Sequence, residues 1–451
     1  MKPYWLSVLP LGAAAIIFIV RRQRPLVVGL GLATTLACAR LSLSLPLDSV
    51  TSFMGQQWML DQLGQVLLAF IYVTTAIMVA IAAVAEQDEW FPAPALAGCG
   101  LLSAVVLLRS VLLSFMLLPA ALLVLILATS PSSPSTVRGA SRFLTWITLP
   151  ILCVPVTLTI LERFALSPDE LVLADLSAWL VVPPIILWLT LFPFDGATRL
   201  WSRDSLSLAS VFLWTVKDSV VVYLLLFLWR QNPVLYTESA TVALGIAGLV
   251  TAVVSGVLAF AQSSPSAVLA CAAMSELGIA MQGVTTSSID GLLSGVFLLL
   301  SRSVAVLLAS SALAAAHGAF ARDTESNPGP LRWRSLAVLI AFAVGVLAMA
   351  GMPPLGGFLG RKQIYAALQA KEPYLLLAWW SASAGIVLGL VRTGWSLWHA
   401  KGQPPSVHLR DLPLLLVLCL LLLCLWIGYR SQAIVNLISD LFRDLLPLFP
   451  L

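Results

Sequence analysis

Charged residues are scarce in this chain. Asp, Glu, Lys and Arg make up 10% of the 451 residues, whereas a soluble domain carries about 25%. Hydrophobic residues make up 60%. This composition excludes an ordinary soluble domain, and the small net charge of +4 gives no indication of a nucleic-acid partner.

Residues that bind metals or form disulfides are also few. The three histidines, His317, His399 and His408, are too far apart in sequence to indicate a metal site. The six cysteines form no CxxC pair and lie mostly within apolar runs, which is typical of buried, inert thiols. No Gly-rich phosphate loop, GxSxG or HExxH motif is present. We therefore expect no metal, no cofactor and no redox centre in this chain.

Long apolar runs dominate what remains. Runs of about 20 apolar residues recur along the whole chain, which predicts a polytopic membrane protein. They lack strict alternation, so helices are expected rather than a barrel. We predict an all-α protein with about fourteen transmembrane helices, among them 205–230 and 335–360. The connecting loops are short, so residues 1–451 are expected to form a single membrane domain.

The C-terminal segment differs from these runs. Over 431–449, apolar and charged residues fall on opposite faces at helical spacing, which predicts an amphipathic helix. Such a helix lies on the membrane surface or against a partner subunit. A last helix packed on the rest of the chain is the alternative.

Five ionisable residues lie within or beside predicted spans. They are Lys217, Glu276, Arg302, Arg361 and Lys362. A charge at the centre of a membrane helix costs roughly 2.5–3.5 kcal/mol even on the lenient insertion scale, so such residues mark ion or proton pathways. The alternative for each is a structural charge with no role in transport. Asp218 follows Lys217 directly, but consecutive helical residues point in different directions, so it is not required as the partner.

A helix break is predicted within the stretch LAMAGMPPLGGFLGRKQIY at 347–365. Pro353, Pro354, Gly356 and Gly357 interrupt the apolar run. The cations Arg361 and Lys362 follow just beyond the break. A broken helix exposes backbone groups, which a membrane tolerates only where they are buried in protein or line a water-filled cavity.

This stretch resembles the broken-helix motif of the antiporter-like membrane subunits of respiratory complex I. Related chains occur in energy-converting hydrogenases and in multisubunit sodium/proton antiporters. Three further stretches resemble other motifs of the same family: FPFDGATRLW, LAFAQSSPSAVLACAAMSELGIAMQGV and LLSGVFLLLSRSVAVLLASSAL. The resemblance covers roughly 60–400, and the subunit N branch fits the length best. It implies two inverted five-helix repeats, at about 94–230 and 241–393, each with a broken helix.

The family's charged positions are only partly kept. By resemblance, Lys217 matches the lysine of the first broken helix, and Glu276 falls on a histidine position. Arg302 and Arg361 fall on lysine positions, and the glutamate of the fifth span falls near Ala120. Because arginine does not release its proton in proteins, these two arginines are expected to be fixed charges. The predicted proton pathway therefore consists of Lys217, Glu276 and Lys362.

The resemblance implies a proton-translocating subunit of a complex I-like NADH/ferredoxin:quinone oxidoreductase or a membrane-bound hydrogenase-type complex. Its partners would be other membrane and peripheral subunits, the lipid bilayer and protons, in a bacterial-type inner membrane. One alternative is a non-pumping structural subunit, which the arginines and Ala120 favour. Another is a subunit of a sodium/proton antiporter. The proline motif argues against a fourth alternative, a conventional solute carrier.

Overall fold

A computed structural model describes residues 2–85, 91–128, 134–167, 170–196, 208–320, 333–369, 375–399 and 411–442. In this part of the chain, nine helices are long and apolar enough to cross a membrane. Further apolar helices of 10–17 residues lie at Trp5–Ile19, Pro92–Leu107, Val111–Ile126, Val172–Trp188 and Leu336–Met349. The predicted all-α membrane fold is confirmed, while the number of spans stays a prediction.

The elements follow one another with short connections. The first half contains α1 Trp5–Ile19, α2 Arg24–Ser44, β1 Thr51–Phe53, β2 Gln56–Trp58, α3 Gln62–Ala85, α4 Pro92–Leu107, α5 Val111–Ala128, α6 Pro134–Thr148, η1 Leu149–Leu152, α7 Cys153–Leu166 and α8 Leu171–Trp188. The second half contains α10 Leu208–Phe212, η2 Leu213–Lys217, α11 Asp218–Gln231, η3 Pro233–Leu235, α12 Glu238–Ala261, α13 Pro265–Thr285, α14 Ile289–Phe320, α15 Trp333–Met349, α16 Gly356–Gln369, α17 Leu375–His399, α18 Asp411–Tyr429 and α19 Ser431–Leu441.

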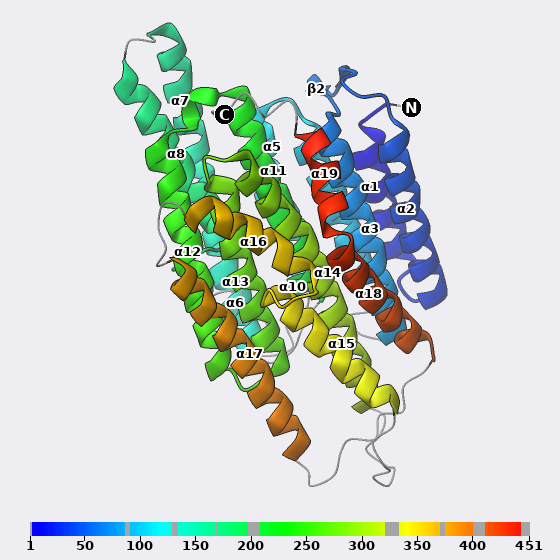
Figure 1. The fold of residues 1–451 in the computed structure, drawn as a ribbon. Helices are drawn as coiled ribbons and strands as arrows, with labels where there is room; N and C mark the ends of the chain where they lie inside the picture. The colour runs from blue at the N-terminus through cyan, green and yellow to red at the C-terminus, as the bar shows by residue number, and fades with distance from the viewer. Residues whose placement is uncertain are drawn as a thin grey trace.

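The long helices lie side by side in one bundle (Figure 1). Helices α1 to α3 form one flank, α7, α8 and α12 form the other, and α16 and α19 lie on the face toward the viewer. Every residue of α13 after Pro265 is buried, and so are all those of α10–α11 up to Trp229. These two interior helices carry Lys217 and Glu276, so both charges lie inside the protein rather than against lipid.

Glycines bring the backbones of α12, α13 and α17 close together. A Cβ atom on Gly278 of α13 would lie 2.6 Å from the backbone nitrogen of Ala252 on α12. A Cβ atom on Gly256 of α12 would lie 2.6 Å from the Cα of Ala382 on α17. Small residues at such contacts are what allows membrane helices to pack closely. The packing places Glu276 on α13 and Ser383 on α17 around one interior position.

The predicted span at 335–360 divides into two helices. Helix α15 ends at Met349 and α16 begins at Gly356. Pro353 and Pro354 lie between them, and the helix is interrupted there because proline lacks the N–H group that a helix requires. Gly351 adopts a φ of +74°, a conformation that favours glycine.

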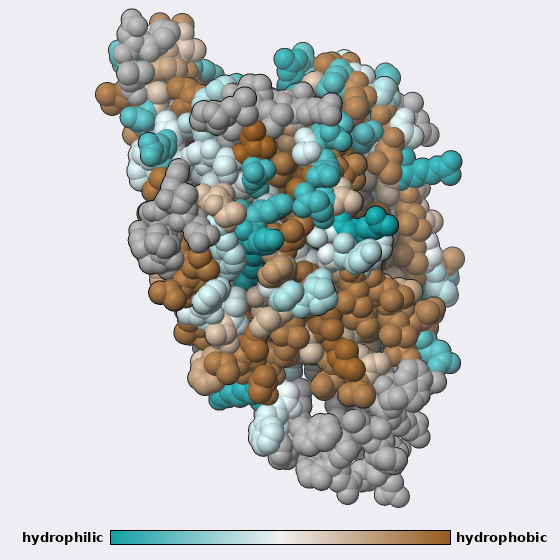
Figure 2. All heavy atoms as spheres, viewed as in Figure 1, coloured by the Kyte–Doolittle hydropathy of each residue, from teal (hydrophilic) through white to brown (hydrophobic). Residues whose placement is uncertain are grey.

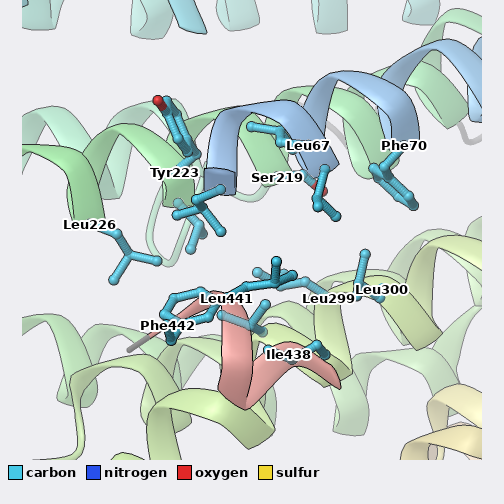
Figure 3. A pocket seen from close by; sticks show the side chains of 14 residues that line it. Leu67, Phe70, Ser219, Tyr223, Leu226, Leu299, Leu300, Ile438, Leu441 and Phe442 are labelled. Atoms are coloured by element: carbon cyan, nitrogen blue, oxygen red, sulfur yellow. The ribbon is translucent and has the colours of Figure 1, made fainter. Parts of the chain in front are cut away.

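Helix α19 continues the chain directly after α18. It was predicted over 431–449, and it is described to Leu441; 443–449 lies outside the described residues. On its inner side, Ile438, Leu441 and Phe442 line an apolar cavity of about 80 Å³. Residues of α3, α11 and α14 form the other walls of this cavity (Figure 3). The apolar face of α19 therefore packs on this chain itself.

A short antiparallel hairpin before α3 was not predicted. Strands β1 and β2 pair over three residues each. Met54 and Gly55 form the turn, both with positive φ, at 50° and 72°. The hairpin adds no span to the bundle.

Candidate functional site

The first buried charge lies at an irregular turn within the interior helix. Helix α10 passes into a π-turn over Leu213–Lys217, and α11 begins at Asp218. The N–H of Asp218 donates to the carbonyl of Leu213, five residues earlier. Such π-turns occur frequently at functional sites because they change the direction of side chains and backbone groups. Lys217 thus stands at the end of a local irregularity in an otherwise regular helix.

Asp218 is shared by two buried cations. The Nζ of Lys217 lies 2.7 Å from Oδ1 of Asp218, and Nη2 of Arg302 lies 2.9 Å from Oδ2. All three residues are only 1% exposed. One carboxylate therefore balances two positive charges in the protein interior.

Arg302 joins three helices through hydrogen bonds. From α14, its Nη1 donates to the carbonyl of Trp214 in the π-turn at 2.7 Å. Its Nε donates to the carbonyl of Ala273 on α13, also at 2.7 Å. With the contact to Asp218, the planar guanidinium uses three separate donors. Its geometry holds the π-turn against α13.

Lys217 also caps the end of a helix. Its Nζ donates to the carbonyl of Trp188, the last residue of α8, at 2.7 Å. The last carbonyls of a helix have no partner within the helix and require one from elsewhere. The same ammonium lies 5.6 Å from the centroid of the Phe143 ring, within the range of a cation–π interaction.

The second buried charge pair lies beside the α15–α16 break. Arg361 on α16 binds Glu276 on α13 through both Nε and Nη2, the Nε bond being 2.9 Å long. The Nη1 of Arg361 donates to Ser383 at 2.8 Å, and Nη2 also donates to the carbonyl of Met349. Met349 is the last residue of α15. Arg361 therefore caps α15 much as Lys217 caps α8.

Gly357 lets the Glu276 carboxylate approach the start of α16. A Cβ atom at Gly357 would lie 2.9 Å from Oε1 of Glu276. Gly357 is the second residue of α16, where the unpaired N–H groups and the helix dipole favour a negative charge. Oε1 forms no hydrogen bond to a described protein group.

The structure brings together most of the residues singled out in the sequence. Lys217 and Arg302 meet at Asp218, and Glu276 meets Arg361. The hydrogen bond from Arg302 to Ala273 connects the two groups, because Ala273 lies one turn before Glu276 on α13. Lys362 does not join them, since its side chain is exposed on the outside of α16.

The sequence pattern did not predict that Asp218 pairs with Lys217. It is the direct partner of Lys217 although the two residues are consecutive. The flexible four-carbon stem of lysine reaches back to its neighbour at the end of the π-turn. Glu276, which falls on a histidine position of the family, binds Arg361.

The arrangement has limited chemical capacity. Among the described residues, no group of three His, Cys, Asp or Glu side chains gathers to hold a metal ion. We call the connected charges Lys217, Asp218, Arg302, Glu276 and Arg361 the row; it contains three cations and two carboxylates. The two arginines keep their protons, so only Lys217 and the carboxylates can change protonation. The titratable groups of this site are therefore one amine and two carboxylates.

A third buried acid lies outside the spans, before α3. Asp61 caps α3 by accepting from the N–H of Gly64 at 2.9 Å. It also accepts from Tyr223 and lies 3.3 Å from Arg230 at the end of α11. Burial raises the pKa of Asp61, and these hydrogen bonds and Arg230 only partly oppose the rise. Asp61 thus fastens the start of α3 to the end of α11.

This raised pKa predicts a pH dependence of stability. A carboxyl whose pKa is raised on folding contributes stability below its ordinary pKa and loses it as the pH rises through the folded pKa. We expect the melting temperature of the purified chain in detergent to fall with rising pH in that window. Asp61→Asn should flatten the profile there, whereas Asp48→Asn, at an exposed position, should leave it unchanged. If Asp61→Asn had the same pH profile of melting temperature as the unmodified chain, Asp61 would not be the group responsible for the pH dependence.

A helical membrane fold with paired charges at two interrupted helices is the kind of arrangement found in antiporter-like membrane proteins. The comparisons agree with this class. Residues 200–387 match the model of the family described as NADH:quinone oxidoreductase/Mrp antiporter, transmembrane. The matched segment contains the π-turn, both charge groups and the α15–α16 break.

Curated relatives are subunits N of NADH-quinone oxidoreductase. The protein of Hirschia baltica is 23% identical over 210 residues, which are 44% of this chain and 44% of that protein. The protein of Heliobacterium modesticaldum is 26% identical over 151 residues, 34% of this chain and 31% of that protein. The matches thus span less than half the length of these relatives.

Solved structures share the fold over nearly the whole chain. A chain of the Mrp complex from Dietzia sp. DQ12-45-1b matches with a TM-score of 0.78 and 14% identity, covering 99% of this chain and 98% of that chain. A chain of an archaeal membrane-bound sulfane sulfur reductase gives 0.79 and 15%, covering 99% and 98%. A chain of respiratory complex I from Thermus thermophilus gives 0.77 and 19%, covering 100% of both.

Proposed function

We propose that this chain is a proton-translocating, antiporter-like membrane subunit of a multisubunit complex of complex I type or membrane-bound hydrogenase type. The observation that supports this most is Lys217, a buried amine in a π-turn that shares one carboxylate with a permanent cation. The proposed partners are the other membrane and peripheral subunits and the protons it moves. The proposed location is a bacterial-type plasma membrane.

The shared carboxylate makes loss of a proton from Lys217 feasible. With Lys217 charged, two cations face Asp218; with Lys217 neutral, Arg302 and Asp218 remain as a balanced pair. A buried lysine is the cation whose pKa changes readily with its surroundings. Neither protonation state leaves Asp218 without a cation, so the site can alternate between the two states.

An ion pair and hydrogen bonds connect Lys217 to the charged residues in the second half of the protein. Arg302 links Asp218 to the Ala273 carbonyl, and Glu276 follows one turn later. We place Lys217 and Glu276 as the groups that exchange protons, and Arg302 and Arg361 as fixed charges that bias them. Lys362 would act at the outer edge of the row, because it is exposed next to Arg361.

A non-pumping structural subunit is the second candidate. Asp218 and Glu276 are both bound by guanidinium groups, which do not release protons, and Lys217 is 1% exposed. The likeness to a chain of an Mrp complex supports a third candidate, a subunit of a sodium/proton antiporter complex.

Lys217→Arg tests the proposal because it keeps the positive charge and removes the releasable proton. In membrane vesicles containing the assembled complex, we expect proton release to fall about tenfold or more, with assembly intact. Arg109→Gln changes an exposed loop cation and should leave proton release unchanged. Normal proton release by Lys217→Arg would favour the structural subunit. Release driven by a sodium gradient without electron transfer would assign the chain to an antiporter complex.

A further inference from the structure

Helix α19 is about half as long as a membrane hydrocarbon core is thick. It begins after Tyr429, where Gly428 packs against the backbone of Pro354 and Gly356 at the helix break. At its other end, Leu441 lines the same cavity as Leu63, which stands at the start of α3. Its 11 residues extend about 16 Å, half of a hydrocarbon core of about 30 Å.

The inner face of α19 is already occupied. Val435 and Ile438 are buried, and Leu441 and Phe442 point with Ile438 toward α3 and α11 (Figure 3). The amphipathic pattern of this helix is therefore satisfied on its apolar side by the chain itself. Its outer side is exposed on the surface of the bundle.

That outer side is mixed: Leu437 is 64% exposed on it, and the acid Asp440 is exposed near the end of the helix, beside several polar residues. Gln432 and Asn436 are exposed on α19, and Arg430 is exposed just before it. Lys362 is exposed on the adjacent α16, where Gln363 lies 3.5 Å from Gln432. Figure 2 shows hydrophilic residues gathered over α16 and α19, above a broad hydrophobic band. We call the four residues Lys362, Arg430, Gln432 and Asn436 the polar face.

Lipid is an unsuitable neighbour for the polar face. A Lys or Arg at the centre of a membrane helix costs roughly 2.5–3.5 kcal/mol, and an unsatisfied amide in hydrocarbon costs several kcal/mol. Long side chains such as Lys362 can extend toward the headgroups, but the short side chains of Gln432 and Asn436 cannot. Gln432 accepts from Gln363 and donates to Asn436, so a partner helix would have to satisfy only their remaining amide groups, together with the two cations.

We propose that the polar face docks a membrane helix of a neighbouring subunit that carries a carboxylate at the same depth. Among the described residues, Lys362 and Arg430 form no ion pair, so the face presents two cations. An acidic group on the partner complements both, and further polar groups bind Gln432 and Asn436. The inference rests on the proposed membership of a multisubunit complex, but not on proton translocation.

Substitution by leucine tests whether a partner helix or lipid covers the polar face. The double variant Lys362→Leu/Arg430→Leu should leave the melting temperature of the isolated chain in detergent unchanged, since neither side chain is buried. Copurification of the neighbouring membrane subunit with the tagged chain should fall about tenfold, the effect of losing about 1.4 kcal/mol. Undiminished copurification would overturn the proposal, because leucine is well suited to a lipid-facing position.

A photo-crosslinking residue identifies what covers the face. Placed at position 436 in the native complex, it should form a crosslink to a membrane helix that contains Asp or Glu. At position 246, an exposed isoleucine on α12 serves as a control for a position outside the polar face. Crosslinks from 436 to lipid alone, or to a helix without an acid, would contradict the proposal.

Charge exchange completes the test. Lys362→Glu should disrupt copurification, and replacing the partner's crosslinked acid by lysine should restore it. Failure of this rescue would overturn the predicted ion pair. Because the readout is assembly, a subunit that assembles in this way but releases no protons would refute the proposed function and leave this interface intact.

Discussion

Asp218→Ala is expected to prevent stable accumulation of the folded chain in the membrane. The change leaves Lys217 and Arg302 facing each other as buried cations without an anion. Removing one partner of a buried ion pair costs about 3–5 kcal/mol, and here two cations lose the same partner. The total is comparable to the whole free energy of unfolding of many domains, about 5–15 kcal/mol. The amount of folded chain in membranes and its melting temperature in detergent measure the effect.

Two controls make this prediction specific. Asp290→Ala removes an exposed acid from the first turn of α14 and should change stability little, because an exposed acid contributes little. Lys217→Met in the Asp218→Ala background removes one of the opposed cations and should recover part of the lost stability. A melting temperature of Asp218→Ala equal to that of the unmodified chain would show that Asp218 is not the anion that balances the row.

Arg361→Met is expected to destabilise the chain by about 3–5 kcal/mol, because it leaves Glu276 buried without its cation. The variant also removes the donor to the Met349 carbonyl at the end of α15. Glu276→Leu should have a similar cost, since it strands the guanidinium. The double variant is expected to be within about 1 kcal/mol of the unmodified chain or more stable, because a buried pair replaced by apolar residues needs no desolvation of charge.

A double-mutant cycle on melting curves measures this coupling. Arg392→Met, which removes an exposed arginine that donates to the Phe260 carbonyl, is the matched single change and should have a small effect. If the effects of Arg361→Met and Glu276→Leu simply add, the two residues act independently and the second charge pair has been misassigned.

The helical architecture was predictable because its signal is local. Apolar runs long enough to cross a membrane specify where helices form, whatever their neighbours. The break between α15 and α16 was predictable for the same reason, since Pro353 and Pro354 cannot continue a helix. The exact division was not, and the predicted span at 335–360 ends at Met349.

The pairing of the charges was not predictable from local pattern. Arg302 and Asp218 are 84 residues apart, and Arg361 and Glu276 are 85 apart. Only the packing of α10–α11, α13, α14 and α16 decides which charges meet. The π-turn carries no proline or glycine over 208–217, so nothing in its composition announces it. The assumption of a regular helix therefore directed the Asp218 side chain away from Lys217, whereas the π-turn allows the two to pair.

The two helix ends that are capped by cations differ in one respect that chemistry can exploit. A neutral amine is a poorer donor than an ammonium, so a proton leaving Lys217 would loosen its grip on the final carbonyl of α8. The guanidinium that holds the end of α15 stays charged throughout. The end of α15 is thus held in every protonation state, whereas deprotonation of Lys217 would weaken the hydrogen bond at the end of α8 and let that end move.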